Sequence, residues 1–184
     1  MRTPKTISTQ TVAQAALLSA AALVFLFAAG MIPTGWTGVT AVAGLAVAVA
    51  VSASGYLTGI LCYAVTSILS FLIIPGKHAA ILFASLFGLY PLLKIRMERL
   101  KSRVASIAIK LVFFNVVFLL LIQFASTLLW GDLLAQWPYS VPLQPVLCLV
   151  GSVIFLLYDF AFTKVMALLQ SRLVPQLHRM FRHR

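Results

Sequence analysis

Long apolar stretches alternate with short polar turns along the whole chain, and this alternation is its main structural signal. A helix that crosses a bilayer takes about 20 predominantly apolar residues, and a helix satisfies its own backbone hydrogen bonds in hydrocarbon. The pattern predicts an all-α integral membrane protein, a single six-helix transmembrane domain over residues 1–184 that ends in a basic cytoplasmic tail at 170–184. The expected spans are 11–32, 38–53, 55–74, 78–95, 104–130 and 142–169.

Composition supports the membrane interpretation. The sequence is 62% hydrophobic and 9% charged, whereas a soluble domain carries about 25% charged residues. So few polar groups cannot cover a soluble surface. The net charge of +11 agrees with basic residues that flank membrane spans and contact anionic membrane lipid. Stacking aromatics interleaved with base-reading polar groups are absent, so we expect no nucleic-acid partner.

Basic residues are distributed unevenly about the six expected spans. With six spans both termini lie on one side, and that side holds thirteen of the 14 Lys and Arg residues. Because cytoplasmic loops carry an excess of these residues, both termini are predicted to be cytoplasmic, in a bacterial cell membrane. The first span follows Arg2 and Lys5 as a signal peptide would, but its apolar part exceeds the ~7–15 residues of a signal core. We interpret it as an uncleaved helix.

The remaining basic residue, Lys77, lies on the outer side in the turn Pro75-Gly76-Lys77-His78. One interpretation is a polar turn within an aromatic belt, which is common in membrane proteins. The other is an outward pocket, in which Lys77 contacts an anionic or carbonyl group of a solute, Asp132 contacts a donor, and tryptophan forms an apolar wall. The candidate substrate-binding residues are Trp36, Lys77, His78, Gln123, Trp130 and Asp132.

A carboxylate, Asp159, lies deep in the sixth span. At the bilayer centre an unpaired carboxylate costs at least ~2.5 kcal/mol, so it should face the bundle and find a partner. Counting the helical rise from the outer ends places Lys94 and Asn115 at a similar depth, with Lys110 one to two turns nearer the cytoplasm. We favour a structural ion pair over a proton relay, because a relay needs a chain of titratable groups. The expected buried polar cluster is Lys94, Lys110, Asn115, Tyr158 and Asp159.

Two features, a proline in the fourth span and a pair of alanines in the first, can each be interpreted in two ways. Pro91 removes a backbone donor from the fourth span and should kink it, with Gly88 allowing close approach; simple packing and a moving hinge are both consistent with this pattern. Ala16 and Ala20 lie on one face of the first span in the small-xxx-small pattern that lets another helix approach. They could serve contacts within the bundle or contacts with a separate partner.

Enzyme signatures are missing. The acids are only Glu98, Asp132 and Asp159, and there is no phosphate-binding loop, zinc-protease motif or nucleophile elbow. Cys62 and Cys148 lie inside apolar runs without Cys or His at metal spacing, as small buried hydrophobes do. We therefore expect no catalytic residues, no metal, no disulfide and no cofactor.

The segment "IIPGKHAAILFASLFGLYPLLKIRMERL" resembles a group of small bacterial membrane proteins related to the substrate-binding S components of energy-coupling factor (ECF) transporters. In that group a Pro-x-Lys turn precedes a helix ending in Phe-Gly-x-Tyr-Pro-x-x-Lys. The last span also resembles the group's last helix, through the aromatic-Asp pair Tyr158-Asp159 and the downstream Lys164. The positions that match the first motif are Pro75, Lys77, Phe87, Gly88, Tyr90, Pro91 and Lys94.

The resemblance implies a six-helix S-component bundle that captures a vitamin or similar micronutrient from the outer face. It implies a transmembrane coupling subunit and two ATPase subunits as partners, because this chain has no nucleotide-binding motif of its own. Ala16 and Ala20 match the alanine motif that meets the coupling subunit, and the outer loops would hold the small-molecule solute. Motifs of the thiamine, riboflavin or biotin members are not evident, so the solute stays open.

A different class of function is a non-transport membrane scaffold, as the rod-shape protein MreD is. The basic cytoplasmic segments would then dock partners. A solute binder needs a concave outer pocket with converging polar groups, whereas a scaffold needs none.

Overall fold

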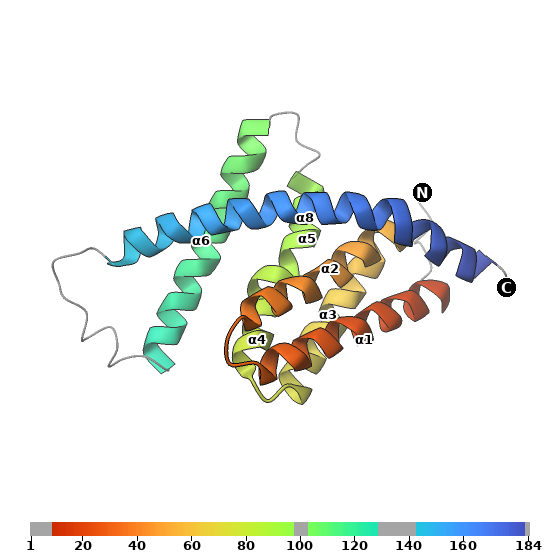
Figure 1. Cartoon of the computed structure of the whole chain (residues 1–184), viewed down its shortest axis with the longest axis horizontal. Coiled ribbons are helices and arrows are strands. Elements are labelled where there is room, and N and C mark those ends of the chain that lie inside the picture. The colour runs from red at the N-terminus through yellow and green to blue at the C-terminus, as the bar shows by residue number, and fades with distance from the viewer. Residues whose placement is uncertain (1–8, 98–102, 129–142, 183–184) are drawn as a thin grey trace, which may run out of the picture. The chain divides into compact units, whose positions relative to one another are not determined.

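The computed structural model describes residues 9–97, 103–128 and 143–182 (Figure 1). These residues form helices joined by short turns, and the described ranges contain no strand. The helices are α1 (Thr9–Met31), α2 (Trp36–Ser54), α3 (Tyr56–Ile73), α4 (Lys77–Leu82), the π-helix η1 (Phe83–Phe87), α5 (Leu89–Met97), α6 (Arg103–Leu128) and α8 (Leu143–Arg182).

Six helical segments are long and apolar enough to cross a membrane, with α4, η1 and α5 together forming the fourth, Lys77–Met97. The all-α class and the six apolar spans predicted from the sequence are confirmed, and the chain is a multi-pass membrane protein. The last apolar span, Pro145–Leu168, agrees with the predicted 142–169. Its helix continues beyond this span to Arg182, so most of the basic tail is helical.

The chain forms two compact units. The first unit contains residues 1–96 and 163–184, and the second contains residues 97–162. Within the first unit α1, α2 and α3 lie side by side and pack against one another, and α4 and η1 pack against them (Figure 1).

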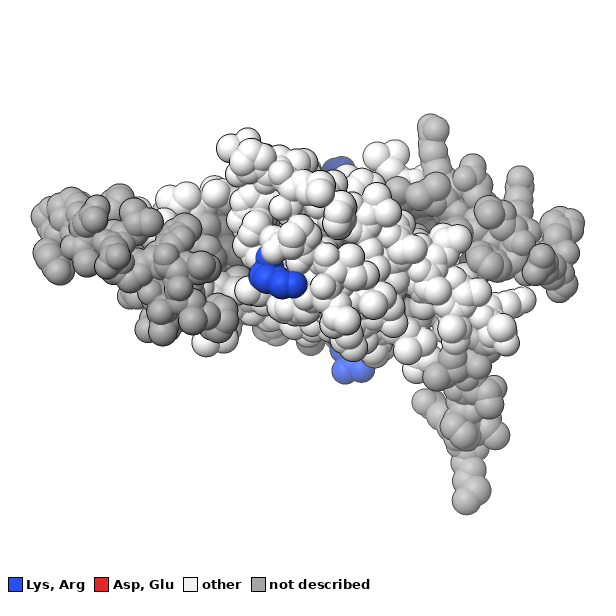
Figure 2. Space-filling model, turned by 90° about the horizontal axis from the view of Figure 1, so that it is seen from below, with Lys and Arg blue, Asp and Glu red and all other residues white. Residues whose placement is uncertain are grey.

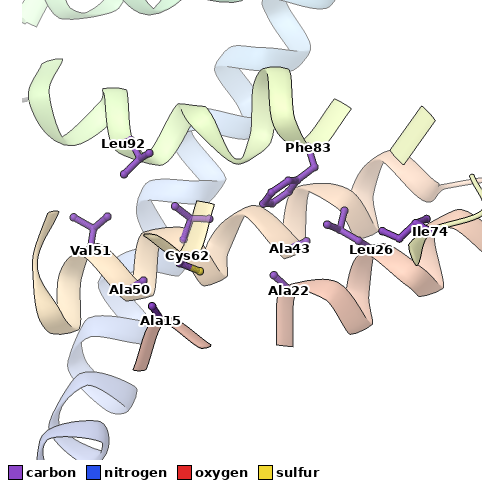
Figure 3. Packing of buried hydrophobic residues seen from close by; sticks show 11 residues of the cluster. Ala15, Ala22, Leu26, Ala43, Ala50, Val51, Cys62, Ile74, Phe83 and Leu92 are labelled. Atoms are coloured by element: carbon purple, nitrogen blue, oxygen red, sulfur yellow. The ribbon is translucent and has the colours of Figure 1, made fainter. Parts of the chain in front are cut away.

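Small side chains fill the core of the first unit and let its helices approach closely. Alanines from α1 and α2 face each other, and Leu26, Phe83 and Leu92 fill the space between the backbones (Figure 3). Because lipid tails are as apolar as leucine, close van der Waals packing between small residues is a main source of helix association in membranes. The fully or nearly fully buried alanines of this cluster are Ala15, Ala22, Ala43 and Ala50.

The backbones of α2 and η1 approach each other closely at Gly44. A methyl group added at Gly44 would lie 2.5 Å from the carbonyl oxygen of Phe87 and 3.1 Å from its carbonyl carbon. Only a hydrogen atom fits between these two backbones, so glycine is required at position 44.

The fourth span is broken one turn before Pro91. The Gly88 N–H donates to the Phe83 carbonyl oxygen at 2.7 Å, five residues back, instead of to Ala84 as in an α-helix. The Ala84 carbonyl oxygen instead accepts a hydrogen bond from the Tyr63 hydroxyl of α3 at 2.7 Å. Pro91 has no N–H to offer the Phe87 carbonyl, which lies beside Gly44. The irregularity expected at Pro91 is thus a π turn whose displaced carbonyl groups meet α2 and α3.

The surface suits a lipid environment. Many large apolar side chains are exposed, including Val24 at 69% and Leu72 at 75%, whereas soluble monomers rarely expose large contiguous apolar patches. The face seen in Figure 2 carries only isolated Lys or Arg side chains among its described residues. The charged groups of the spans are therefore few and require individual explanation.

Candidate functional site

Trp36 and His78, two of the predicted pocket residues, come together at one end of the first unit. Their ring centroids lie 4.5 Å apart with the planes at 74°, an edge-to-face contact. Trp36 opens α2 directly after Gly35, whose φ of 81° makes the left-handed turn that starts the helix. His78 lies in the first turn of α4.

Two glycines make this contact possible. A methyl group added at Gly76 would lie 3.0 Å from both the Cα atom and the carbonyl oxygen of Gly30, near the end of α1. The turn before α4 therefore packs backbone to backbone against α1, and this places His78 next to the start of α2. The sequence pattern gave no indication of the Gly30–Gly76 contact, because the two residues are far apart in the chain.

Lys77 is exposed, and its Nζ donates a hydrogen bond to the carbonyl oxygen of Phe71 in the last turn of α3. Carbonyl groups at a helix C-terminus lack intrahelical partners and carry partial negative charge, so a lysine there is stabilising. The lysine thus closes the α3–α4 turn. An ammonium group has three donors, so this bond leaves donors for a second acceptor.

The other predicted pocket residues are described only in part. Gln123 belongs to α6 in the second unit, and its side chain lies outside the described residues. Trp130 and Asp132 also lie outside the described residues. The described portion of the predicted pocket is therefore Trp36, Lys77 and His78.

Asp159 forms an ion pair with Lys110 inside the second unit. The Lys110 Nζ donates to the Asp159 Oδ2 at 3.0 Å, and the two side chains are only 7% and 17% exposed. Lys110 is one of the two lysines that were predicted as partners of Asp159. Such a pair keeps both charges away from hydrocarbon while joining α6 to α8.

A second polar contact joins the same two helices. The Asn115 side-chain amide donates to the Ser152 hydroxyl at 3.0 Å and to the Leu111 carbonyl at 2.9 Å. Asn115 follows Lys110 by five residues on α6, whereas Ser152 precedes Asp159 by seven residues on α8. The opposite directions show that the two helices are antiparallel. Ser152 was missed by the sequence analysis, although Asn115 and Ser152 are isolated polar residues at matching depths.

Tyr158 belongs to a ladder of aromatic rings in the second unit. Its ring centroid lies 6.4 Å from that of Phe155 and 5.6 Å from that of Phe162. Phe155 in turn stacks on Phe114 at 4.5 Å. These ring contacts fix the packing of α8 on α6 beside the Lys110–Asp159 ion pair.

Lys94, the remaining member of the expected polar cluster, belongs to the first unit. It is 4% exposed, and its Nζ donates to the Thr163 hydroxyl at 2.6 Å. The same Nζ lies 5.7 Å from the ring centroid of the fully buried Tyr90. The other four members, Lys110, Asn115, Tyr158 and Asp159, belong to the second unit, and each contact described here lies within one unit.

Ala16 and Ala20 are exposed on α1, whereas Ala15, Ser19 and Ala22 are buried. The Ser19 hydroxyl donates to the Cys62 carbonyl oxygen at 3.3 Å, which identifies the face of α1 that packs on α3. The small-xxx-small pair is therefore not used within the described part of the bundle and is open to lipid or to a partner helix.

Among the described residues, no three His, Cys, Asp or Glu side chains gather as a metal site requires. Comparison of the chain with models of protein families, with curated protein sequences and with solved structures gives no match.

Proposed function

We propose that the chain is the membrane-embedded solute-binding subunit of an ECF-type importer, which captures a small water-soluble micronutrient from the outer face. In this proposal it spans the bacterial cell membrane six times with both termini in the cytoplasm. The observation that carries the proposal is the contact between Trp36 and His78 beside Lys77. These residues come from two different turns, and they were selected together as candidate solute ligands from the sequence.

The three side chains supply complementary chemistry for a small polar molecule. The Trp36 ring offers an apolar or stacking wall, and the His78 imidazole offers a donor and an acceptor. Lys77 keeps one donor on the Phe71 carbonyl and directs another to an anionic or carbonyl group of the solute. In the proposal Gln123, Trp130 and Asp132 complete the site.

A transmembrane coupling subunit and two ATPase subunits would supply the energy for uptake. The exposed pair Ala16 and Ala20 supports a helix partner on that face of α1, because small residues let two backbones approach closely. We expect the purified protein to retain a small molecule that mass spectrometry detects, and to co-purify with an ATPase pair. A scaffold would retain no solute and would purify without these ATPases.

Lys77→Ala is expected to weaken binding of the retained solute by about 10- to 100-fold, because a hydrogen bond to a charged group contributes about 1.5–3 kcal/mol. Calorimetric affinity in detergent measures the effect. Lys77→Gln is the matched control, since glutamine can still donate to the Phe71 carbonyl but carries no charge. If both variants melt as the parent does and bind with unchanged affinity, Lys77 is only a turn residue.

The proposed topology is tested by cysteine labelling in a chain whose own cysteines are replaced by alanine. A cysteine at the exposed Pro75 should react with a membrane-impermeant maleimide in intact cells, and one at the exposed Gln10 only after permeabilisation. Gly76 is unsuitable as a probe position, because a side chain there would press on Gly30. The reverse pattern of labelling would show that the termini face outward.

A further inference from the structure

Helix α8 is longer than a membrane span. It contains 40 residues and extends about 60 Å at 1.5 Å per residue, whereas the hydrocarbon core of a bilayer is roughly 30 Å thick. Its apolar candidate span is Pro145–Leu168. The backbone therefore stays helical for 14 further residues, Leu169 to Arg182, which we call the tail helix.

The sequence of the tail helix separates apolar from basic residues. At 100° per residue its six large apolar residues fall within one arc of roughly 140°, in which Gln170 is the one polar residue. Arg172, Arg179, Arg182 and His178 all fall outside this arc. The apolar residues are Leu169, Leu173, Val174, Leu177, Met180 and Phe181.

Charge and local chemistry add to this pattern. No Asp or Glu follows Asp159 in the sequence, so the tail is purely basic. The Ser171 hydroxyl donates to the Leu168 carbonyl at 2.9 Å, a side-chain contact of the kind that bends helices. Pro175 has no N–H for the Ser171 carbonyl, which weakens the helix at the same place. The helix can therefore bend just after its apolar span ends.

We propose that the tail helix binds the surface of the same bilayer that the chain crosses, with its apolar arc in the interface and its arginines on anionic headgroups. A helix with Leu and Phe on one face and Arg on the other lies in the plane of a membrane interface. The tail helix directly follows an apolar candidate span, so that span would keep it near the membrane surface. This inference does not depend on the proposed solute binding.

The full-length protein in lipid nanodiscs tests the proposal. Cys62 and Cys148 are replaced by alanine, and an environment-sensitive fluorophore is attached to Leu177→Cys or, as the matched control outside the apolar arc, to His178→Cys. In nanodiscs containing phosphatidylglycerol the probe at 177 should shift to shorter wavelength and be quenched by a lipid-borne nitroxide. The probe at 178 should keep the emission of a water-exposed dye.

Charge removal provides the second arm. Each arginine near an anionic surface strengthens binding roughly five-fold, so Arg172→Gln, Arg179→Gln and Arg182→Gln together should lower the ratio of bound to free tail about a hundredfold. Equal emission from the two probe positions overturns the proposal. The proposal is also overturned if the probe at 177 is as strongly shielded in pure phosphatidylcholine nanodiscs, and in the triple variant, as it is in the parent with phosphatidylglycerol. The apolar arc would then pack on the protein itself.

Discussion

Asp159→Ala is expected to destabilise the protein by about 3–5 kcal/mol, because removing one member of a buried ion pair leaves the other charge in a shielded site. The Lys110 side chain is only 7% exposed, and its carboxylate partner lies 3.0 Å away. Thermal unfolding of the purified protein in detergent measures the loss.

The double variant Lys110→Met with Asp159→Leu distinguishes the cost of an unpaired charge from the loss of the ion pair itself. It removes both charges and replaces them with apolar side chains, so it should be more stable than Asp159→Ala alone. Ser152→Ala removes only neutral hydrogen bonds, the one accepted from Asn115 and the one donated to the Cys148 carbonyl, and should lose about 0.5–1.5 kcal/mol for the bond between the helices. Equal melting temperatures for Asp159→Ala and Ser152→Ala would contradict the assignment of a shielded ion pair.

The number and limits of the spans could be predicted from the sequence, because hydrocarbon imposes a minimum apolar length on every helix. The end of α8 could not, because the apolar length that a bilayer requires determines where a span ends and not where its helix ends. Pro91 indicated an irregular fourth span. The position of the π turn was not predictable, because the Tyr63 hydroxyl that donates to the displaced Ala84 carbonyl oxygen comes from another helix.

Individual residues of the candidate site could be predicted from the sequence, but their contacts could not. Lys77 was predicted because it is the one basic residue on the expected outer side. Trp36 and His78 were predicted because they lie in the expected outer turns. Their contact depends on the approach of Gly30 to Gly76, and a pattern along one chain does not show which glycines meet. Counting the helical rise reduced the partners of Asp159 to two lysines. The count did not distinguish the two lysines, because it takes no account of helix tilt.

Gly44→Ala is expected to destabilise the protein by about 1–3 kcal/mol, the usual cost of overpacking a core. The added methyl group would lie 2.5 Å from the Phe87 carbonyl oxygen. A flexible side chain could turn away, but this oxygen belongs to the backbone of the π turn. Either α2 or the fourth span must move, and the movement would disturb the Tyr63–Ala84 hydrogen bond that stabilises the same turn.

Gly38→Ala provides a control on the same helix with the opposite expected sign. A methyl group there meets nothing within 4 Å, and alanine in a helix is more stable than glycine by roughly 0.5–1 kcal/mol. Thermal unfolding in one detergent should therefore place Gly38→Ala at or above the parent and Gly44→Ala clearly below it. If the two variants have the same melting temperature, α2 does not contact the π turn as closely as the structure describes, and the Gly44 contact does not determine the position of the fourth span.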